Sequence, residues 1–135
     1  MAMPTAGWLA DDLGPAKVVF LRPMEGVEAV VVVDNVALGP AIGGVRVRQD
    51  VSAAEVARLA RAMTLKNAVA GLPHGGGKSG IVAPPDLTPE DHERLIRAFA
   101  RSIECLTDYI PGPDMGTTER SMAYVSVQLI LGLVR

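Results

Sequence analysis

The 135-residue sequence contains a single cysteine, Cys105, which excludes an internal disulfide and favours a reducing compartment. Its net charge is −2 and it has no basic run, which argues against nucleic acid or an anionic membrane surface as a partner. No apolar stretch approaches the roughly 18 residues of a membrane span, and the N-terminus lacks the charged and apolar regions of a signal peptide. The cytoplasm is therefore the expected location.

Aromatic residues make up only 4% of the sequence, but 49% of the residues are hydrophobic, so the chain can bury a core. The length fits one domain, and no repeat or linker divides it. β-branched runs indicate strands, and capping residues followed by helically spaced apolar residues indicate helices. This order is α/β, with one mixed β-sheet and helices packed on it. The expected strands are residues 17–21 and 27–33 (a hairpin), 45–48, 79–83 and 109–110. The expected helices are about 53–70, 88–106 and a third one capped by Thr117 or Thr118.

Two lysines stand in surroundings that lysines usually avoid. Lys66 closes the first helix on a face shared with Leu59 and Met63, which should point at the core. Lys78 follows the glycines 75–77, which we interpret as a loop whose backbone can approach a ligand closely. Each feature has an ordinary alternative, because a lysine near a helix end often extends its ammonium to water and a glycine run can be only a flexible loop. Together they favour a site that needs positive charge.

The glycines also bear on nucleotide binding. Gly75, Gly77 and Gly80 match G-x-G-x-x-G, but that pattern should follow a strand and open a helix, whereas here an extended segment ends at two prolines. The Walker A pattern fails as well, since Leu72 stands where its first glycine is needed. An unrelated α/β protein that binds phosphate here is therefore the least favoured of three hypotheses.

A carboxylate ligand suits two lysines and one aspartate. One ammonium could hold the carboxylate, while the other, desolvated beside a like charge, could act as a base or polarise a carbonyl. Asp114, near the start of the third helix, could exchange a proton with the substrate, although a turn residue would give the same pattern. His74 and His92 have no metal-ligand spacing with the cysteine, so no metal site is expected, and His92 is expected at the solvated surface.

Four motifs carry a family resemblance. They are residues 41–46 (AIGGVR), 63–68 (MTLKNA), 75–78 (GGGK) and 109–117 (YIPGPDMGT). In this order and spacing, the sequence resembles the N-terminal domain of the glutamate/leucine/phenylalanine/valine dehydrogenases over about residues 15–124. The resemblance implies a substrate-binding and dimerisation domain, hence subunit contacts in a homo-oligomer.

The resemblance also implies roles for individual residues. The lysine matching Lys66 binds the substrate α-carboxylate. The lysine matching Lys78 is catalytic and assists attack of water on the imino acid, and the aspartate matching Asp114 handles protons at the substrate nitrogen. The implied reaction is the reversible oxidative deamination of an L-amino acid to its 2-oxo acid and ammonia. Further substrate-binding positions fall on Ile42, Gly43, Gly76 and Gly77.

Two departures from the family pattern bear on function. Glutamate-specific members place a lysine where this sequence has Ile42, and an apolar residue there is similar to the leucine and phenylalanine enzymes. Burying an unpaired carboxylate beside isoleucine would be costly, so an apolar amino acid is expected. Relatives also continue into a Rossmann domain that binds NAD(P), which is expected to be absent here. NAD(P) is thus implied by the family, but the chain alone is expected to be inactive.

The domain prediction has three parts: an N-terminal extension (1–14), the substrate-binding and dimerisation domain (15–124), and an apolar tail (125–135) that differs from relatives and fits a truncated or frameshifted end. In the favoured hypothesis the chain is the substrate-binding and oligomerisation half of an NAD(P)-dependent amino-acid dehydrogenase, truncated before the cofactor domain. The second hypothesis is a stand-alone, non-catalytic module derived from that family. The tail, apolar on every side, predicts self-association.

Overall fold

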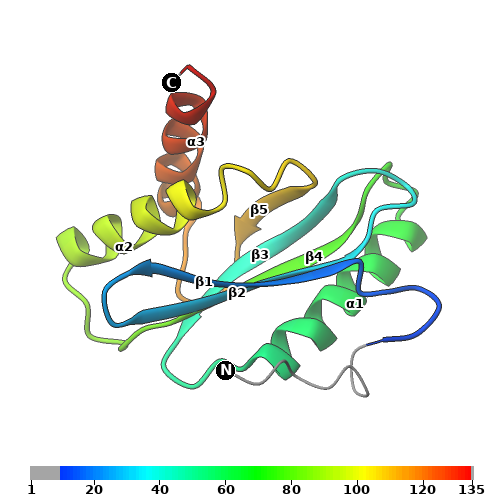
Figure 1. Cartoon of the computed structure of the whole chain (residues 1–135), viewed down its shortest axis with the longest axis horizontal. Helices are drawn as coiled ribbons and strands as arrows, with labels where there is room; N and C mark the ends of the chain where they lie inside the picture. The colour runs from blue at the N-terminus through cyan, green and yellow to red at the C-terminus, as the bar shows by residue number, and fades with distance from the viewer. Residues whose placement is uncertain (1–9, 135) are drawn as a thin grey trace.

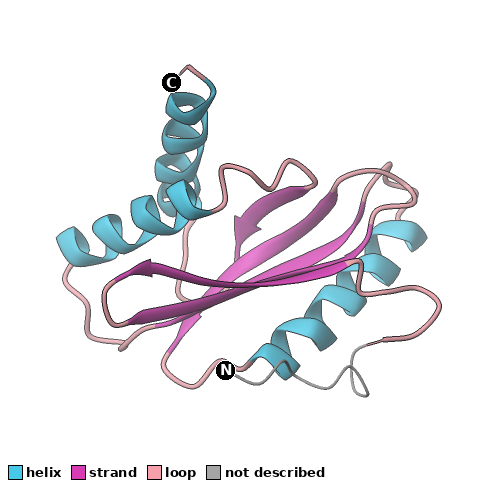
Figure 2. Ribbon diagram, in the orientation of Figure 1, coloured by secondary structure: helices cyan, strands magenta, loops and turns pink. Residues whose placement is uncertain are grey.

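The computed structural model describes residues 10–134, so the expected N-terminal extension up to residue 9 and the terminal Arg135 lie outside the described residues. A five-stranded sheet has one helix on one face and two helices on the other (Figure 1, Figure 2). This confirms the α/β prediction with a mixed sheet. The elements are β1 (Lys17–Met24), β2 (Val27–Asn35), β3 (Ala41–Arg48), α1 (Ala53–Val69), β4 (Gly75–Val82), α2 (Pro89–Ser102), β5 (Tyr109–Pro113) and α3 (Glu119–Leu133).

The strands are ordered β1-β2-β4-β3-β5 across the sheet. β1 pairs with β2, and β2 with β4, in antiparallel orientation, while β3 runs parallel to both β4 and β5. β1 and β2 form the predicted hairpin, whose turn contains Gly26 at φ +75°, a conformation that glycine adopts readily. The inner strands are therefore β2, β4 and β3, and the edges are β1 and β5.

Two strands begin earlier than predicted. β4 starts at Gly75 and includes the three glycines that we interpreted as a loop, and β3 starts at Ala41 rather than at Val45. Both segments are rich in small residues with low intrinsic strand preference. Their backbones are nonetheless paired, because β4 lies between β2 and β3, and β3 lies between β4 and β5. The loop prediction was wrong because a local pattern does not show pairing with two neighbours.

β2 is apolar on both sides, because helices cover both faces of the sheet. Val30 and Val32 pack with residues of α1 in one cluster. Val31 and Val33 belong to the larger core on the opposite face. That core is completed by helix residues, the largest of which are Leu95, Ile96 and Phe99 of α2 and Val125 of α3.

Capping residues set the helix starts as predicted. Ser52, Thr88 and Thr118 each accept a hydrogen bond from a backbone N–H in the first turn of α1, α2 and α3. The carboxylate of Glu55 binds the guanidinium of Arg48 on β3, at 2.6 and 2.7 Å. The first turn of α1 is thereby joined to the sheet.

Lys66, predicted to share the core-facing side of the first helix, is exposed. Its expected neighbours Leu59 and Met63 are only half-buried. α1 instead packs through small and polar residues, since the amide of Asn67 is buried and donates to the carbonyl of Gly75, at 2.7 Å. A buried helix face of this composition gives only a weak helical periodicity of apolar residues. For this reason the predicted orientation of Lys66 toward the core was wrong. The buried positions of α1 are Val56, Ala60 and Asn67.

Arg61 of α1 connects this helix with the end of β2 and with the segment that precedes β1. Its guanidinium donates to Asp34 at the end of β2, at 2.8 Å, and to Asp11, at 2.6 and 2.7 Å. Asp34 is only 2% exposed and also accepts a hydrogen bond from Thr64, at 2.6 Å. The hydrogen bonds from Arg61 lower the pKa of Asp11 below its usual value. The stabilisation from Asp11 is therefore present at neutral pH and is lost as the pH falls through this lowered pKa.

We expect Arg61→Met to lower the free energy of unfolding by about 2–3 kcal/mol at pH 7, because the buried Asp34 would lose its cation. The difference from the wild type should shrink at acid pH, as carboxylates become protonated. Urea unfolding followed by circular dichroism measures both effects. The matched control is Arg58→Met, an exposed arginine on the same helix, with an expected change below about 0.5 kcal/mol. Equal losses in the two variants would contradict a specific role for Arg61.

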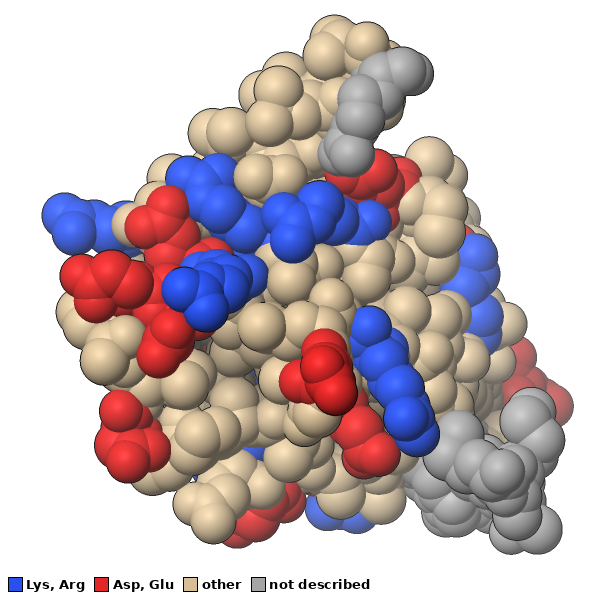
Figure 3. Space-filling model, turned by 60° about the vertical axis from the view of Figure 1, so that its left-hand side comes forward, with Lys and Arg blue, Asp and Glu red and all other residues tan. Residues whose placement is uncertain are grey.

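α3 extends away from the rest of the molecule (Figure 1). It runs through residue 125, where the predicted tail begins, without a break. On the face that Figure 3 shows, the described residues at the projecting end of this helix carry no charged side chains, whereas charges gather on the surface below it. Within residues 10–134, no helix is long and apolar enough to cross a membrane. The exposed apolar residues of this end are Val127, Ile130, Leu131, Leu133 and Val134.

Candidate active site

Lys78 lies on the α1 side of the sheet. In the antiparallel pair of β2 and β4 it is opposite Val32, which packs against α1, and opposite residues share a face. Its side chain is only 8% exposed, and its Nζ lies 3.3 Å from Oδ1 of Asp114. The structure therefore brings together the two predicted catalytic residues, one on an inner strand and one in the loop after β5.

Asp114 is held by side-chain and backbone contacts. Arg46 Nε donates to its Oδ2, at 2.7 Å. Its backbone N–H donates to the hydroxyl of Thr117, at 2.8 Å, and that hydroxyl donates to the carbonyl of Val45, at 2.7 Å. The loop between β5 and α3 is thereby fixed to β3, with the carboxylate between a lysine and an arginine.

The surroundings of Asp114 set its protonation. Burial by itself would raise the pKa of this carboxyl, but the hydrogen bond from Arg46 and the charges of Lys78 and Arg46 outweigh burial and hold the pKa below its usual value. Asp114 is therefore ionised at neutral pH and can accept a proton. Burial raises the pKa of the nearby Tyr109, which keeps its proton.

Lys66 lies on the flank of α1 that faces β3. It follows Glu55 by about three helical turns, so the two residues are on the same side of the helix. The carboxylate of Glu55 lies 3.7 Å from the guanidinium of Arg46 on β3. Lys66 is thus on the side of α1 toward Lys78 and Asp114, but exposed at the margin. The charged group in contact with Lys78 is an acid, Asp114, and not the like charge that the sequence suggested.

The predicted substrate-binding positions Ile42, Gly43, Gly76 and Gly77 lie in β3 and β4. Ile42 is half-buried and in register with Gly76. The glycines have a packing reason, because a Cβ at Gly43 would collide with the carbonyl of Gly77, and a Cβ at Gly76 would collide with the backbone nitrogen of Thr64. The glycines therefore let the strands and α1 approach closely. Their contact with a ligand remains a prediction.

Two residues beside Asp114 had no role in the sequence analysis. Arg46 donates to its carboxylate, and Gly44 leaves room for it, since a Cβ on Gly44 would lie 2.7 Å from the Cβ of Asp114. Ile42, Gly44 and Arg46 alternate along β3 and so share one face. This alternation can be read from the sequence, but it places the three residues on one face only if the strand begins at residue 41, earlier than we predicted.

Tyr109 supports the site from within the sheet. Its hydroxyl donates to the carbonyl of Gly43, at 2.9 Å, and accepts from the hydroxyl of Ser79, also at 2.9 Å. A Cβ at Gly77 would lie 2.9 Å from its ring. Tyr109 thus connects β5 with Gly43 of β3 and with Ser79 of β4, the residue that follows Lys78.

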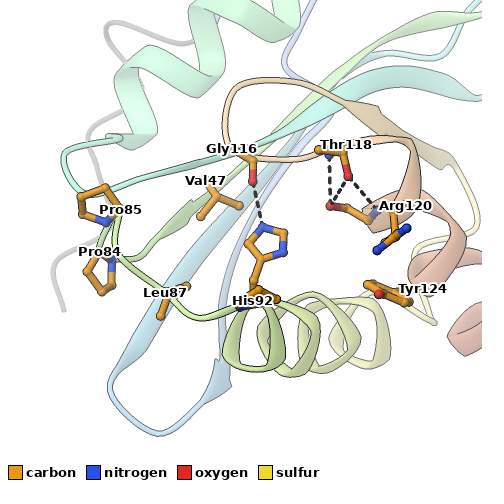
Figure 4. A pocket seen from close by; sticks show the side chains of 11 residues that line it. Val47, Pro84, Pro85, Leu87, His92, Gly116, Thr118, Arg120 and Tyr124 are labelled. Atoms are coloured by element: carbon orange, nitrogen blue, oxygen red, sulfur yellow. Dashed lines mark hydrogen bonds between the residues drawn. The ribbon is translucent and has the colours of Figure 1, made fainter.

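His92 was expected at the solvated surface, but it is half-buried, and its Nε2 lies 2.8 Å from the carbonyl oxygen of Gly116 (Figure 4). This contact joins α2 to the loop that follows Asp114. A cavity of about 300 Å³ lies beside it, between the first turns of α2 and α3. The loop is therefore held at two points, by the hydrogen bond from Thr117 to the carbonyl of Val45 in β3 and by the contact of Gly116 with His92 of α2.

The part of the chain that the structure describes contains no group of three or more His, Cys, Asp or Glu side chains that could hold a metal ion. The glycines do not fit NAD(P) either, because Gly75, Gly77 and Gly80 lie inside β4, which continues to Val82 instead of opening a helix.

The five-stranded mixed sheet with helices on both faces is the fold of the dimerisation domains of amino-acid dehydrogenases. The sequence model of the Glu/Leu/Phe/Val dehydrogenase dimerisation-domain family matches residues 21–129, so the chain belongs to this family. The resemblance seen in the four motifs is thereby confirmed, and the hypothesis of an unrelated phosphate-binding protein is excluded.

Relatives with different substrates are similar to this chain. Leucine dehydrogenase of Bacillus subtilis is 40% identical over 102 residues, which are 72% of this chain and 28% of the relative. An NADP(+)-dependent glutamate dehydrogenase of Pyrobaculum calidifontis is 43% identical over 95 residues, which are 67% of this chain and 23% of the relative. The chain thus spans about a quarter of the length of these relatives.

Solved structures of two relatives share the fold. Hetero-hexameric glutamate dehydrogenase of Thermus thermophilus, in a Leu-bound form, superposes with a TM-score of 0.81 at 34% identity, over 89% of this chain and 32% of that one. L-Tryptophan dehydrogenase of Nostoc punctiforme superposes with a TM-score of 0.75 at 30% identity, over 88% of this chain and 37% of that one.

Proposed function

We propose that this chain forms the substrate-binding and oligomerisation part of an NAD(P)-dependent amino-acid dehydrogenase, which converts an apolar L-amino acid reversibly to its 2-oxo acid and ammonia. The observation that carries the proposal is the ion pair of Lys78 and Asp114, 3.3 Å apart, on the side of the sheet that α1 flanks with Lys66. Family membership and the leucine and glutamate dehydrogenase relatives support this class of reaction. The nicotinamide cofactor would be bound by residues other than those described.

In the proposed site, the exposed ammonium of Lys66 binds the α-carboxylate of the substrate. Lys78 assists the attack of water on the imino carbon, and Asp114 exchanges a proton with the substrate nitrogen. The lowered pKa of Asp114 keeps its carboxylate ionised, so it can accept a hydrogen bond from the substrate ammonium, the contact along which the proposed proton exchange would take place. The remaining contacts to the substrate are assigned to Ile42, Gly43, Gly76 and Gly77.

Ile42 supports the preference for an apolar side chain. It lies on the same face of β3 as Arg46, the residue that contacts Asp114. Its side chain has no donor for a second carboxylate, so a glutamate side chain would lose hydration there without an ionic partner. Leucine, valine or phenylalanine would instead bury apolar surface against it.

Oligomerisation is supported by the family description and by two features of the fold. β1 forms one edge of the sheet, and an edge strand presents backbone groups with which another chain can pair. The projecting end of α3 presents apolar side chains. We therefore propose that the chain assembles with further copies of itself.

The test of the proposed site uses binding of 4-methyl-2-oxopentanoate, the 2-oxo acid of leucine, to the 135-residue chain by NMR titration. We expect Lys66→Met and Lys78→Met each to weaken binding by about tenfold or more, because each removes a charge-assisted contact. Lys17→Met, which removes a lysine of the edge strand β1, is the matched control and should bind normally. Binding that survives both site substitutions would reject the proposed site.

A second arm of the experiment concerns specificity. Ile42→Lys should strengthen binding of 2-oxoglutarate relative to 4-methyl-2-oxopentanoate, because the new ammonium can pair with the second carboxylate. An unchanged ratio of the two dissociation constants would contradict the apolar preference that we assign to Ile42.

The alternative function is a non-catalytic binding and oligomerisation module derived from the same family. It would use the same lysines to hold a carboxylate, so the two proposals differ in chemistry rather than in binding. The gene sequence just beyond codon 124 distinguishes them, since a Rossmann pattern there in another reading frame would support the dehydrogenase, whereas intergenic sequence would support the module.

A further inference from the structure

The charged residues around Asp114 form one connected series. Lys78 Nζ lies 3.3 Å from Oδ1 of Asp114, and Arg46 Nε donates to Oδ2, at 2.7 Å. Arg46 Nη1 lies 3.7 Å from Oε1 of Glu55, which is also bound by Arg48, at 2.6 Å. The signs alternate along the series, from the buried Lys78 outward to the more exposed Arg48.

Arg46 is placed to control the direction of the Asp114 carboxylate. Its side chain is 13% exposed and that of Asp114 is 20% exposed, so solvent screens their contact only in part. Because Arg46 holds Oδ2, the other oxygen is left for Lys78. Gly44, on the same face of β3, leaves the space beside the Cβ of Asp114. β3 therefore supplies both the space beside the Cβ of Asp114 and the hydrogen bond to its carboxylate.

We propose that Arg46 is a positioning residue that acts through Asp114, by fixing one carboxylate oxygen so that the other faces Lys78 and the substrate nitrogen. The inference rests on the proposed function for the identity of the substrate, but the contact itself does not. The groups that face Asp114 are Arg46 of β3, Lys78 of β4 and the buried Tyr109 of β5, with Glu55 of α1 behind Arg46. Of these, Arg46 makes the shortest contact with the carboxylate.

The test follows the titration of the Asp114 carboxyl by carbon NMR in the intact chain. Arg46→Met should raise the titration midpoint by about one pH unit or more, because an adjacent cation and its hydrogen bond favour the ionised acid. Arg46→Lys, which keeps the charge but not the guanidinium geometry, should raise the midpoint by less. Arg58→Met, the exposed arginine on α1, is the control and should leave it unchanged. A role of Arg46 that does not involve the Asp114 carboxylate would lower stability without moving this midpoint.

An unchanged midpoint in Arg46→Met overturns the proposal. If that variant does not fold, Arg46→Lys decides, and no rise there overturns the proposal as well. The outcome is separate from that of the binding experiment. A chain that fails to bind 4-methyl-2-oxopentanoate but shows the rise would reject the substrate site and retain the positioning contact.

Discussion

Gly76→Ala is expected to lower the free energy of unfolding by more than about 3 kcal/mol, the largest effect that we predict for a single substitution. A Cβ at this position would collide with the backbone nitrogen of Thr64 and lie 2.5 Å from the carbonyl oxygen of Ala60. Both atoms belong to the backbone of α1 and cannot rotate away, so the helix would have to move off the sheet. Chemical unfolding followed by circular dichroism measures the loss.

The matched control for this substitution is Gly112→Ala. Gly112 lies in β5, and a Cβ there would have no neighbouring atom within 4 Å. The same chemical change should therefore alter stability by less than about 0.5 kcal/mol. Similar stability of the two variants would show that α1 can shift at little cost, against the close packing described above.

The second large effect concerns assembly. Ile130, Leu133 and Val134 are 60%, 86% and 76% exposed at the projecting end of α3. Burying one such side chain is worth about 1.5–3 kcal/mol, so the intact chain should associate and give a mass above 14.2 kDa in light scattering. Replacing all three residues with glutamine should lower this mass and narrow its distribution.

Substitution is a better test than deletion of the whole predicted tail. Val125 is only 2% exposed, and Leu129 packs against the same core, so a cut at residue 125 would remove interior side chains. Val69→Gln provides the control, because Val69 is 90% exposed but stands on α1. A clean monomer for the intact chain, or a mass that the triple substitution leaves unchanged, would contradict the prediction.

The helices could be predicted from the sequence because their signals are local. Thr88 followed by Pro89 fixes the start of α2 through a capping hydrogen bond and a preset backbone angle. The start of β4 could not be predicted in the same way, since Gly76 belongs to a strand through its pairing with Asn35 of β2 and Ile42 of β3, one on either side. Sequence patterns report what a segment prefers and not what its neighbours impose.

In the candidate site, too, local features could be predicted from the sequence and contacts between distant segments could not. Lys78 and Asp114 were named first from their sequence surroundings and then from the family resemblance, but their contact depends on the pairing of β3 with both β4 and β5. Arg46 was visible within the AIGGVR motif and still received no role, because nothing local indicates that it meets an aspartate far along the chain. The exposure of Lys66 was missed because α1 packs through small and polar residues.

The close packing of α1 on β4 has a consequence for ligand recognition. Lys66 extends from the helix and Lys78 from the strand, and Gly76 lets the two backbones touch without an intervening side chain. The separation of the two backbones that carry these lysines is therefore set by main-chain contact, so it should withstand substitution of neighbouring side chains. In the site that we propose, substitutions elsewhere in the pocket could therefore change the preferred ligand side chain without moving the backbones that carry Lys66 and Lys78.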